Sequence, residues 1–300
     1  MTPLDHQIAG AGSAATPVTS AQPRRLTPEE IAEYKEKGFV IARGFFDMDE
    51  LKPLRDEIKK DPTINGSEQG TADSDGNLWN TSVSQQVDNS YLGCLPRLHR
   101  MMHAADDLLG EEAYFWHIKL VRKGADNTGK VDWHQDYPFW YETCLRSAMV
   151  TCSVAVDDCT PENGCMKLVP GSHKLGRIDF DQEMKPVLIA DRLRVQQILD
   201  NFGDAEYAEM KAGDTLFFDP LVLHASDRST NGKRRALVHC TYNARSNEPV
   251  IEEGQEHRFY REVTRLDDDY LKERCFSSVF SGHAFFDNKS LNVVDGKLVY

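Results

Sequence analysis

Several features that mark common classes of protein are absent from this 300-residue sequence. No stretch approaches the roughly 20 apolar residues that a membrane-spanning helix requires. The formal net charge is −13, which argues against nucleic acids and anionic membrane surfaces as partners, because both attract basic patches. The chain also contains no HExxH, P-loop, GxGxxG, GxSxG or CxxC motif. We therefore expect no membrane span, no nucleic-acid partner, and none of the chemistries that those motifs carry.

Cysteine is present without any paired pattern. The seven cysteines are odd in number and have no paired spacing, which fits a reducing compartment and predicts a cytoplasmic protein. The first 25 residues are rich in Ala, Ser, Thr, Gly and Pro and lack an apolar signal-peptide core, so residues 1–25 are predicted to be a disordered tail. Residues 26–300 are predicted to form one domain, because the motifs described below span too much of the chain to divide it.

Helix signals dominate the N-terminal third of the predicted domain. Thr27-Pro28-Glu29-Glu30 combines an N-cap threonine, a first-turn proline and a glutamate three residues on, which predicts a helix to Lys37 that stops at Gly38. A short strand is predicted at 39–42. Further helices are predicted at 48–60, capped by Asp47, and at 95–109.

From residue 113 onward the pattern changes to short runs of aromatic and β-branched residues separated by Gly, Asp, Asn and Pro turns. These runs predict strands at 114–122, 147–157, 165–169, 215–218 and 236–242. The fold class is therefore predicted to be mainly β, with a double-stranded β-helix, the cupin-like jelly roll, as its core and with flanking α-helices.

Three further segments are predicted around this core. Residues at about 61–89 are polar, with Trp79 as the large apolar anchor, and predict a lid-like loop. An insertion at about 176–206 is expected to lie over the barrel and to be partly helical. A C-terminal helical extension is predicted at about 256–300, beginning with a charged helix at 256–275.

One short motif carries most of the chemical information. His134 and Asp136 flank Gln135 in a His-x-Asp triplet, and His224 follows a strand-like run that begins with a Gly-Asp turn. A lone histidine is usually structural, but two histidines and one carboxylate are the ligand set of facial-triad Fe(II) oxygenases. Because residues two apart on a strand face the same way, we expect His134 and Asp136 to chelate one metal ion while Gln135 points away.

An arginine that could bind a carboxylate follows the second histidine in the sequence. Arg235 stands eleven positions after His224, and a guanidinium suits bidentate capture of a carboxylate such as the distal end of 2-oxoglutarate. Arg234 is its neighbour, and strand alternation lets only one of the two face the barrel lumen. The spacing favours Arg235, which leaves Arg234 solvated or in a salt bridge.

The chain resembles the phytanoyl-CoA dioxygenase-like (PhyH) family of Fe(II)/2-oxoglutarate-dependent oxygenases from about Leu26 to Asn243. The stretch from His134 to Trp140 is similar to that of ectoine hydroxylases within this family. The motifs that carry the resemblance are Tyr34-Lys35-Glu36-Lys37-Gly38-Phe39-Val40-Ile41, Gly44-Phe45-Phe46, the HQDY segment, Asn163-Gly164-Cys165-Met166, Pro170-Gly171-Ser172-His173, and Ala212-Gly213-Asp214 through to His224, Ser226 and Arg235.

The resemblance implies a role for each of seven positions. It makes His134, Asp136 and His224 the catalytic metal ligands, and it places 2-oxoglutarate against Arg235 and Ser226. Lys119, on the strand before the triad, is a further candidate for cosubstrate binding, and Trp140 is a candidate substrate wall. His173 follows a Pro-Gly turn and is expected to have a structural or rim role. His117 and His239 could face the pocket or the core, and neither is expected to bind the metal, because the triad is already complete.

The expected activity is that of an oxidoreductase: a dioxygenase that uses Fe(II), 2-oxoglutarate and O2 to hydroxylate a small molecule, with release of succinate and CO2. An amino-acid-like substrate or a secondary metabolite is favoured. The same cofactor chemistry giving desaturation, cyclisation or endoperoxidation is an open alternative, and a non-catalytic cupin-like metal-binding protein is a second one. The sequence leaves the oligomeric state open.

Overall fold

The protein is described from a computed structural model, which covers residues 24–60, 69–85, 87–125, 129–184, 189–250, 259–274, 276, 279, 293–294 and 297–298. The expected N-terminal tail therefore lies almost wholly outside the described residues. Within the described part of the chain, no helix combines the length and the apolar character that a membrane-spanning segment needs.

The core consists of two antiparallel sheets, as the jelly-roll prediction requires. The larger sheet has the order β1-β9-β6-β11-β4-β3-β2, and the smaller has the order β5-β10-β7-β8. The larger sheet contains β1 (Phe39–Ala42), β2 (Gln69–Ala72), β3 (Leu78–Ser84), β4 (Ala113–Lys123), β6 (Met149–Ala155), β9 (Thr215–Phe218) and β11 (Arg235–Ala244). The smaller sheet contains β5 (Val131–His134), β7 (Met166–Leu168), β8 (Glu206–Tyr207) and β10 (His224–Ser226). A separate hairpin pairs β12 (Val293–Val294) with β13 (Lys297–Leu298).

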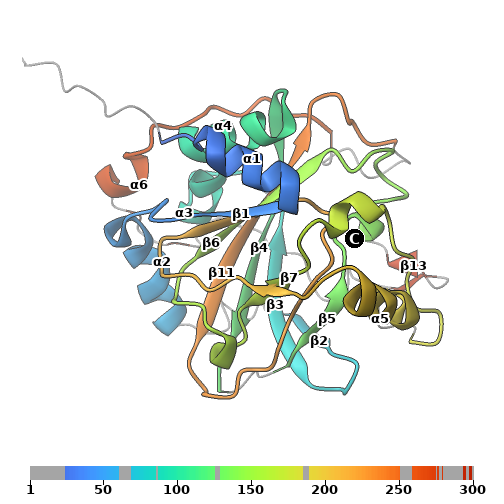
Figure 1. The fold of residues 1–300 in the computed structure, drawn as a ribbon. Coiled ribbons are helices and arrows are strands. Elements are labelled where there is room, and N and C mark those ends of the chain that lie inside the picture. Colours follow the sequence, from blue (N-terminus) through green and yellow to red (C-terminus); the bar gives the residue numbers. More distant parts are fainter. Residues whose placement is uncertain are drawn as a thin grey trace, which may run out of the picture.

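Helices cover the outer face of the larger sheet. The α-helices are α1 (Pro28–Lys37), α2 (Met48–Lys60), α3 (Tyr91–Cys94), α4 (His99–Leu109), α5 (Arg192–Asn201) and α6 (Tyr270–Glu273). Short 3-10 helices are η1 (Leu95–Arg97), η2 (Tyr137–Phe139), η3 (Pro161–Asn163) and η4 (Ser172–Leu175). Figure 1 shows α1 to α4 and α6 toward the left and top of the view, with α5 apart at the right. The largest apolar cluster joins α1 to α4 to alternate residues of β6 and β11.

The alternation along β11 separates the core from the barrel lumen. Ala236, Val238 and Cys240 belong to the cluster under the helices, whereas Leu237 belongs to the cluster between the two sheets. Successive side chains on a strand point to opposite faces, so the odd-numbered residues of β11, Arg235 included, face the lumen. The lumen residues of β4 lie directly opposite them in register: Lys123 faces Arg235, Val121 faces Leu237 and Lys119 faces His239.

The N-terminal signals behave as predicted. Thr27 and Glu30 form a reciprocal capping box at the start of α1, and the helix ends at Gly38, whose φ is +83°. A side chain at Gly38 would be strained by that φ, and its Cβ would lie 2.4 Å from Nδ1 of His173. The predicted strands at 39–42, 114–122, 147–157, 165–169, 215–218 and 236–242 are all present, with small differences at their ends.

Three expectations about the outer segments need correction. Residues 69–84 form β2 and β3 rather than a loop, because β3 pairs with β4 and thereby extends the larger sheet; the neighbouring residues 61–68 lie outside the described residues. The expected charged helix at 256–275 is wrong, since α6 is the one helix in the described part of that segment. The helix expected at 95–109 is divided at Leu98, whose ψ of 141° is not helical.

The insertion at about 176–206, by contrast, is partly helical as expected, because it contains α5.

Candidate active site

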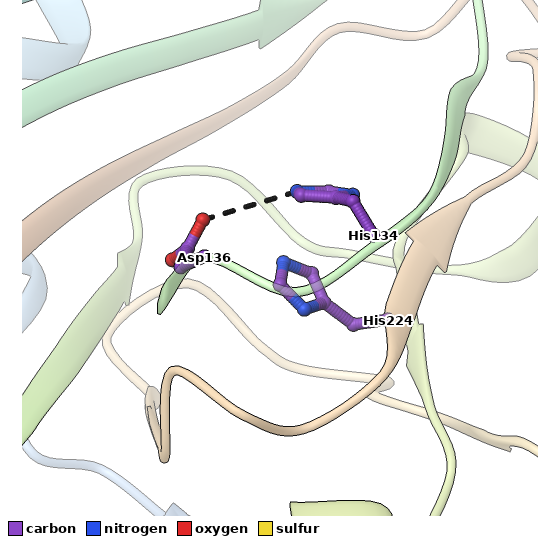
Figure 2. Close-up of side chains that lie close together, drawn as sticks. All are labelled: His134, Asp136 and His224. Atoms are coloured by element: carbon purple, nitrogen blue, oxygen red, sulfur yellow. Dashed lines mark ion pairs between the residues drawn. The ribbon is translucent and has the colours of Figure 1, made fainter. Parts of the chain in front are cut away.

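The three predicted metal ligands come together where β5 meets β10. His134 ends β5 and His224 begins β10, and the two residues are direct partners in the antiparallel ladder. Their ring centroids lie 4.1 Å apart. With Asp136 they form a set whose ligand atoms all lie within 4.8 Å of one another, the one such group among the described residues. Figure 2 shows the three side chains converging from two segments that are far apart in the sequence.

Asp136 reaches the site by a route that differs from the prediction. Strand alternation was expected to align His134 with Asp136, but β5 ends at His134. Asp136 has helical dihedral angles, φ −76° and ψ −38°, and immediately precedes η2. A tight turn therefore brings its carboxylate to 3.9 Å from Nε2 of His134. Gln135 points away from the triad, as expected.

Both imidazoles are held in the same way by the backbone. Nδ1 of His134 lies 2.8 Å from the carbonyl oxygen of Asp132, and Nδ1 of His224 lies 2.9 Å from that of Val222. A carbonyl oxygen only accepts, so each Nδ1 carries the proton that it donates. Each Nε2 is then an acceptor with a free lone pair, which is the form in which a histidine binds a metal ion.

The protonation states suit a divalent cation. Burial lowers the pKa of His134 to about 3, and the nearby His224 adds to this effect. Burial likewise lowers the pKa of His224. Burial alone would raise the pKa of Asp136, but the Lys119 ammonium and the two imidazoles lower it below its ordinary value. At neutral pH the site therefore offers two neutral imidazoles and one carboxylate.

The structure places Arg235 and Arg234 on opposite sides of the sheet, as predicted. The Arg235 side chain is buried, and its Nε and Nη2 donate to the carbonyl oxygen of Gly164 at 3.1 and 2.5 Å. The Arg234 guanidinium instead forms a bidentate pair with Asp157, with both N–O distances 2.7 Å. Arg235 is thus the arginine that is available to the lumen.

Sequence reasoning missed one residue of this pocket, Lys123. It lies opposite Arg235 in the β4–β11 ladder, is fully buried, and donates from Nζ to Oγ of Ser226 at 2.7 Å. Nζ also donates to the carbonyl oxygens of Ser226 (3.3 Å) and Asp227 (2.6 Å). Burial, together with the smaller effect of the Arg235 charge, lowers the pKa of Lys123 to about 6. The available signal was its spacing of four from Lys119, which puts both on one face of β4.

The approach of Gly164 to this pocket explains why a glycine stands there. Its φ is +74°, and a Cβ at this position would lie 2.5 Å from the carbonyl oxygen of Asp227 and 3.0 Å from Cδ of Lys123. A larger residue would therefore displace the carbonyl group that accepts from Arg235. Asn163 sets up the turn, since its side chain accepts from the backbone N–H of Thr160 and donates to Asp158.

Lys119 lies on the metal side of the lumen. Its Nζ is 3.9 Å from Oδ1 of Asp136 and 5.6 Å from the centre of the Trp140 ring. Trp140 is buried and also contacts the His117 ring, with centroids 5.4 Å apart. His239 is buried opposite Lys119, and its Nδ1 pairs with Oγ of Ser153 at 2.6 Å. The structure thus brings Lys119 to the triad rather than to Arg235, with Trp140 beside Lys119.

An aromatic wall continues from the triad to the insertion. The Phe139 ring lies 6.2 Å from the His134 ring, and the Phe180 ring lies 5.1 Å from that of Phe139. Phe180 belongs to the segment predicted as an insertion over the barrel. His173, in η4, packs against Gly38 and takes no part in the triad.

Two jelly-roll sheets with a His-Asp-His set where β5 meets β10 define a metal-dependent oxidoreductase of the dioxygenase class. The chain belongs to the phytanoyl-CoA dioxygenase (PhyH) family, whose model matches residues 34–236.

Similar proteins agree with this assignment. The ectoine dioxygenase of Bordetella bronchiseptica is 27% identical over 237 residues, which cover 74% of this chain and 77% of the relative. The L-proline trans-4-hydroxylase of Streptomyces griseoviridis is 28% identical over 173 residues, 52% of this chain and 64% of the relative. Among solved structures, EctD from S. alaskensis with bound Fe has a TM-score of 0.65 at 20% identity, covering 85% of this chain and 90% of that one. The last likeness supports the fold.

Proposed function

We propose that the protein is an Fe(II)- and 2-oxoglutarate-dependent dioxygenase that hydroxylates a small molecule and releases succinate and CO2. The observation that carries this proposal is the pairing of two sites in one lumen. The first is a set of two imidazoles and one carboxylate that can hold a metal ion, and the second is the buried Arg235, which can hold a carboxylate. EctD has been solved with Fe and with 2-oxoglutarate together with 5-hydroxyectoine, which supports the same pair of ligands here.

The donor set fits Fe(II). Nε2 of His134, Nε2 of His224 and a carboxylate oxygen of Asp136 would be its three protein ligands, and such a set leaves adjacent coordination positions open. When bound, the metal would supply a site at which 2-oxoglutarate and O2 react to oxidise a nearby C–H bond. The backbone carbonyls that hold both Nδ1 atoms keep the imidazole rings aimed at that position.

The far end of 2-oxoglutarate would bind beside β11. Arg235 is held by the Gly164 carbonyl, and two further polar groups lie together: the Lys123 amine on the neighbouring strand β4 and the Ser226 hydroxyl on β10 of the smaller sheet. A carboxylate that entered this pocket would be paired with a guanidinium in a water-poor environment, where charge-assisted hydrogen bonds are strong. We therefore add Lys123 to Arg235 and Ser226 as a cosubstrate-binding residue.

Lys119 suits the substrate better than the cosubstrate. Its acidic neighbour is Asp136, whose charge would be shared with the metal ion once one is bound. The ammonium would then face the lumen beside Trp140 with its charge less compensated. A small substrate that carries a carboxylate would restore that balance, and the Trp140, Phe139 and Phe180 rings would cover its apolar part. We therefore favour an amino-acid-like substrate, and the match to an L-proline hydroxylase supports the same class.

The chain's own residues would also keep water away from the reacting centre. His224 and Asp136 are buried, the Phe139 ring lies beside that of His134, and the Trp140 ring lies beside Lys119. Exclusion of water limits side reactions and strengthens the electrostatic interactions that hold the substrate. The buried, free state of all six cysteines in the described part of the chain fits the reducing cytoplasm that we propose as its location.

The test is a turnover assay that follows succinate. Purified protein is incubated with Fe(II), 2-oxoglutarate, O2 and a panel of cyclic and linear amino acids, and His224→Ala serves as the matched control. Wild type should form succinate in step with a product that is heavier by one oxygen atom. A product lighter by two hydrogen atoms would show the desaturation or cyclisation alternative. Metal binding without succinate formation across the panel and in the absence of substrate would favour the non-catalytic alternative.

A further inference from the structure

Gln135 lies between two of the proposed metal ligands in sequence but faces the opposite way. Its side chain is buried, with a relative exposure of 1%. The amide nitrogen donates to the carbonyl oxygens of Leu221 at 2.6 Å and Gly176 at 2.9 Å. The amide oxygen accepts from the backbone N–H of Ile178 at 2.7 Å. One side chain thus bonds to three backbone groups on two separate segments of the chain.

The first of these segments leads directly to the other histidine. Leu221 lies three residues before His224, and the Val222 carbonyl that orients the His224 ring is the next one along the chain. A second bond reinforces the junction, since the backbone N–H of Tyr137 donates to the carbonyl oxygen of Pro220 at 3.0 Å. The turn that carries His134 and Asp136 is therefore fastened to the turn that carries His224 at a point outside the lumen.

The second segment opens the insertion. Gly176 and Ile178 are its first residues, and Ile178 packs in an apolar cluster with residues of α5 and with Leu223. Two residues further on, Phe180 contacts Phe139, the ring beside His134. The place of this aromatic wall relative to the triad therefore depends on the same amide group.

We propose that Gln135 is a positioning residue that couples the metal ligands to the substrate wall. This inference rests on the proposed function, because it assumes that the triad holds a metal ion. The amide fixes the spacing between the His134–Asp136 turn and the His224 turn, and it fixes the start of the insertion against both. Replacing it should weaken metal binding and substrate binding together. The Arg235 pocket has no bond to Gln135, so cosubstrate binding to the metal-saturated protein should change little.

Three substitutions of Gln135 remove different parts of its set of hydrogen bonds. Gln135→Met keeps the length of the side chain and removes all three hydrogen bonds. Gln135→Glu keeps an acceptor for Ile178 but sets a carboxylate oxygen against two carbonyl oxygens. Gln135→Asn keeps the amide on a shorter stem and should retain part of the effect. Asn247→Leu is the control, because buried Asn247 also donates twice, to Arg146 and Asn243, and accepts once, yet no partner lies in the triad turns.

The experiment measures binding of Co(II) by calorimetry, in the absence of turnover, together with thermal unfolding. As a first control, wild type should bind Co(II) and His224→Ala should not, which shows that Co(II) binds at the triad. If wild type binds no Co(II), the proposed function fails rather than the role of Gln135. Gln135→Met and Gln135→Glu should bind Co(II) at least about tenfold more weakly than wild type, Gln135→Asn should fall between, and Asn247→Leu should bind as wild type does. In turnover, the substrate KM should rise in the Gln135 variants more than the 2-oxoglutarate KM at saturating metal.

The inference is overturned if the Gln135 variants lose thermal stability as Asn247→Leu does while they keep wild-type Co(II) affinity. That result would make the amide a structural bond and nothing more. If Gln135→Met fails to fold, Gln135→Asn decides the question alone, because unchanged Co(II) affinity in that variant also contradicts the proposal.

Discussion

Lys123 allows the electrostatics of the proposed cosubstrate pocket to be tested in the free protein. Its pKa is lowered from an ordinary value of 10.5 to about 6 by burial and by Arg235. Holding the amine neutral at pH 7 then costs about 5 kcal/mol, since each pH unit is worth about 1.4 kcal/mol. A neutral amine has two N–H groups, so it can donate two hydrogen bonds to the three oxygens around Nζ, and these offset roughly 2 kcal/mol of that cost. Lys123→Met should therefore stabilise the metal-free protein by about 3 kcal/mol at pH 7.

The pH dependence makes the prediction sharper. Between pH 6 and 10.5 the unfolded chain holds a proton on Lys123 that the folded protein lacks, so wild-type stability should rise with pH over this window. The advantage of Lys123→Met should shrink by about 1.4 kcal/mol per pH unit and should reverse near pH 9. Below pH 6 the folded and unfolded chains both hold the proton on Lys123, so the difference in free energy of unfolding between wild type and Lys123→Met should stop changing with pH.

Urea unfolding of the metal-free protein at pH 7, 8 and 9 measures this difference. Lys119→Met supplies the baseline for removing a lysine from the same face of β4. A gap between wild type and Lys123→Met that stays constant from pH 7 to pH 9 would refute the reasoning. It would mean that the three oxygens around Nζ keep the ammonium charged in the folded protein.

Three further predictions concern the proposed ligands. His224→Ala should abolish Fe(II) binding and leave the far-ultraviolet circular dichroism unchanged, because the side chain aims into the lumen; undiminished Fe(II) affinity would show that the triad is not the metal site. Arg235→Ala should raise the 2-oxoglutarate Kd at least about tenfold, because about 1.5–3 kcal/mol of charge-assisted hydrogen bonding is lost. Arg234→Ala should mainly lower stability by breaking its pair with Asp157. A larger rise in the 2-oxoglutarate Kd for Arg234→Ala than for Arg235→Ala would exchange their roles. Lys119→Met should raise the KM of a carboxylate-bearing substrate and leave the 2-oxoglutarate Kd nearly unchanged; a selective loss of 2-oxoglutarate affinity would return Lys119 to the cosubstrate.

Features that depend on local sequence were predictable. The capping box at Thr27 and the stop at Gly38 rest on contacts within a few residues. The buried strands of the larger sheet could be read from runs of aromatic and β-branched residues. The meeting of His134 with His224 followed from motif order and was confirmed by their register.

Features that depend on tertiary pairing were not predictable. The polar segment at 69–84 becomes two strands because β4 offers a free edge to β3. The charged pattern at 256–275 looked helical, but residues Leu98 and Leu266 pair with each other in an extended bridge instead. Lys123 became visible as a pocket residue only once the β4–β11 register placed it opposite Arg235.

The most direct test of the proposed activity is the dependence of 2-oxoglutarate binding on the metal ion. Calorimetry under nitrogen would compare the Kd of 2-oxoglutarate for the metal-free protein, the Fe(II)-loaded protein and Asp136→Ala treated with Fe(II). If the triad holds the metal beside the Arg235 pocket, Fe(II) should lower the wild-type Kd by at least about tenfold, or about 1.4 kcal/mol, and Asp136→Ala should lose that gain. Equal 2-oxoglutarate affinity with and without Fe(II) would contradict the account.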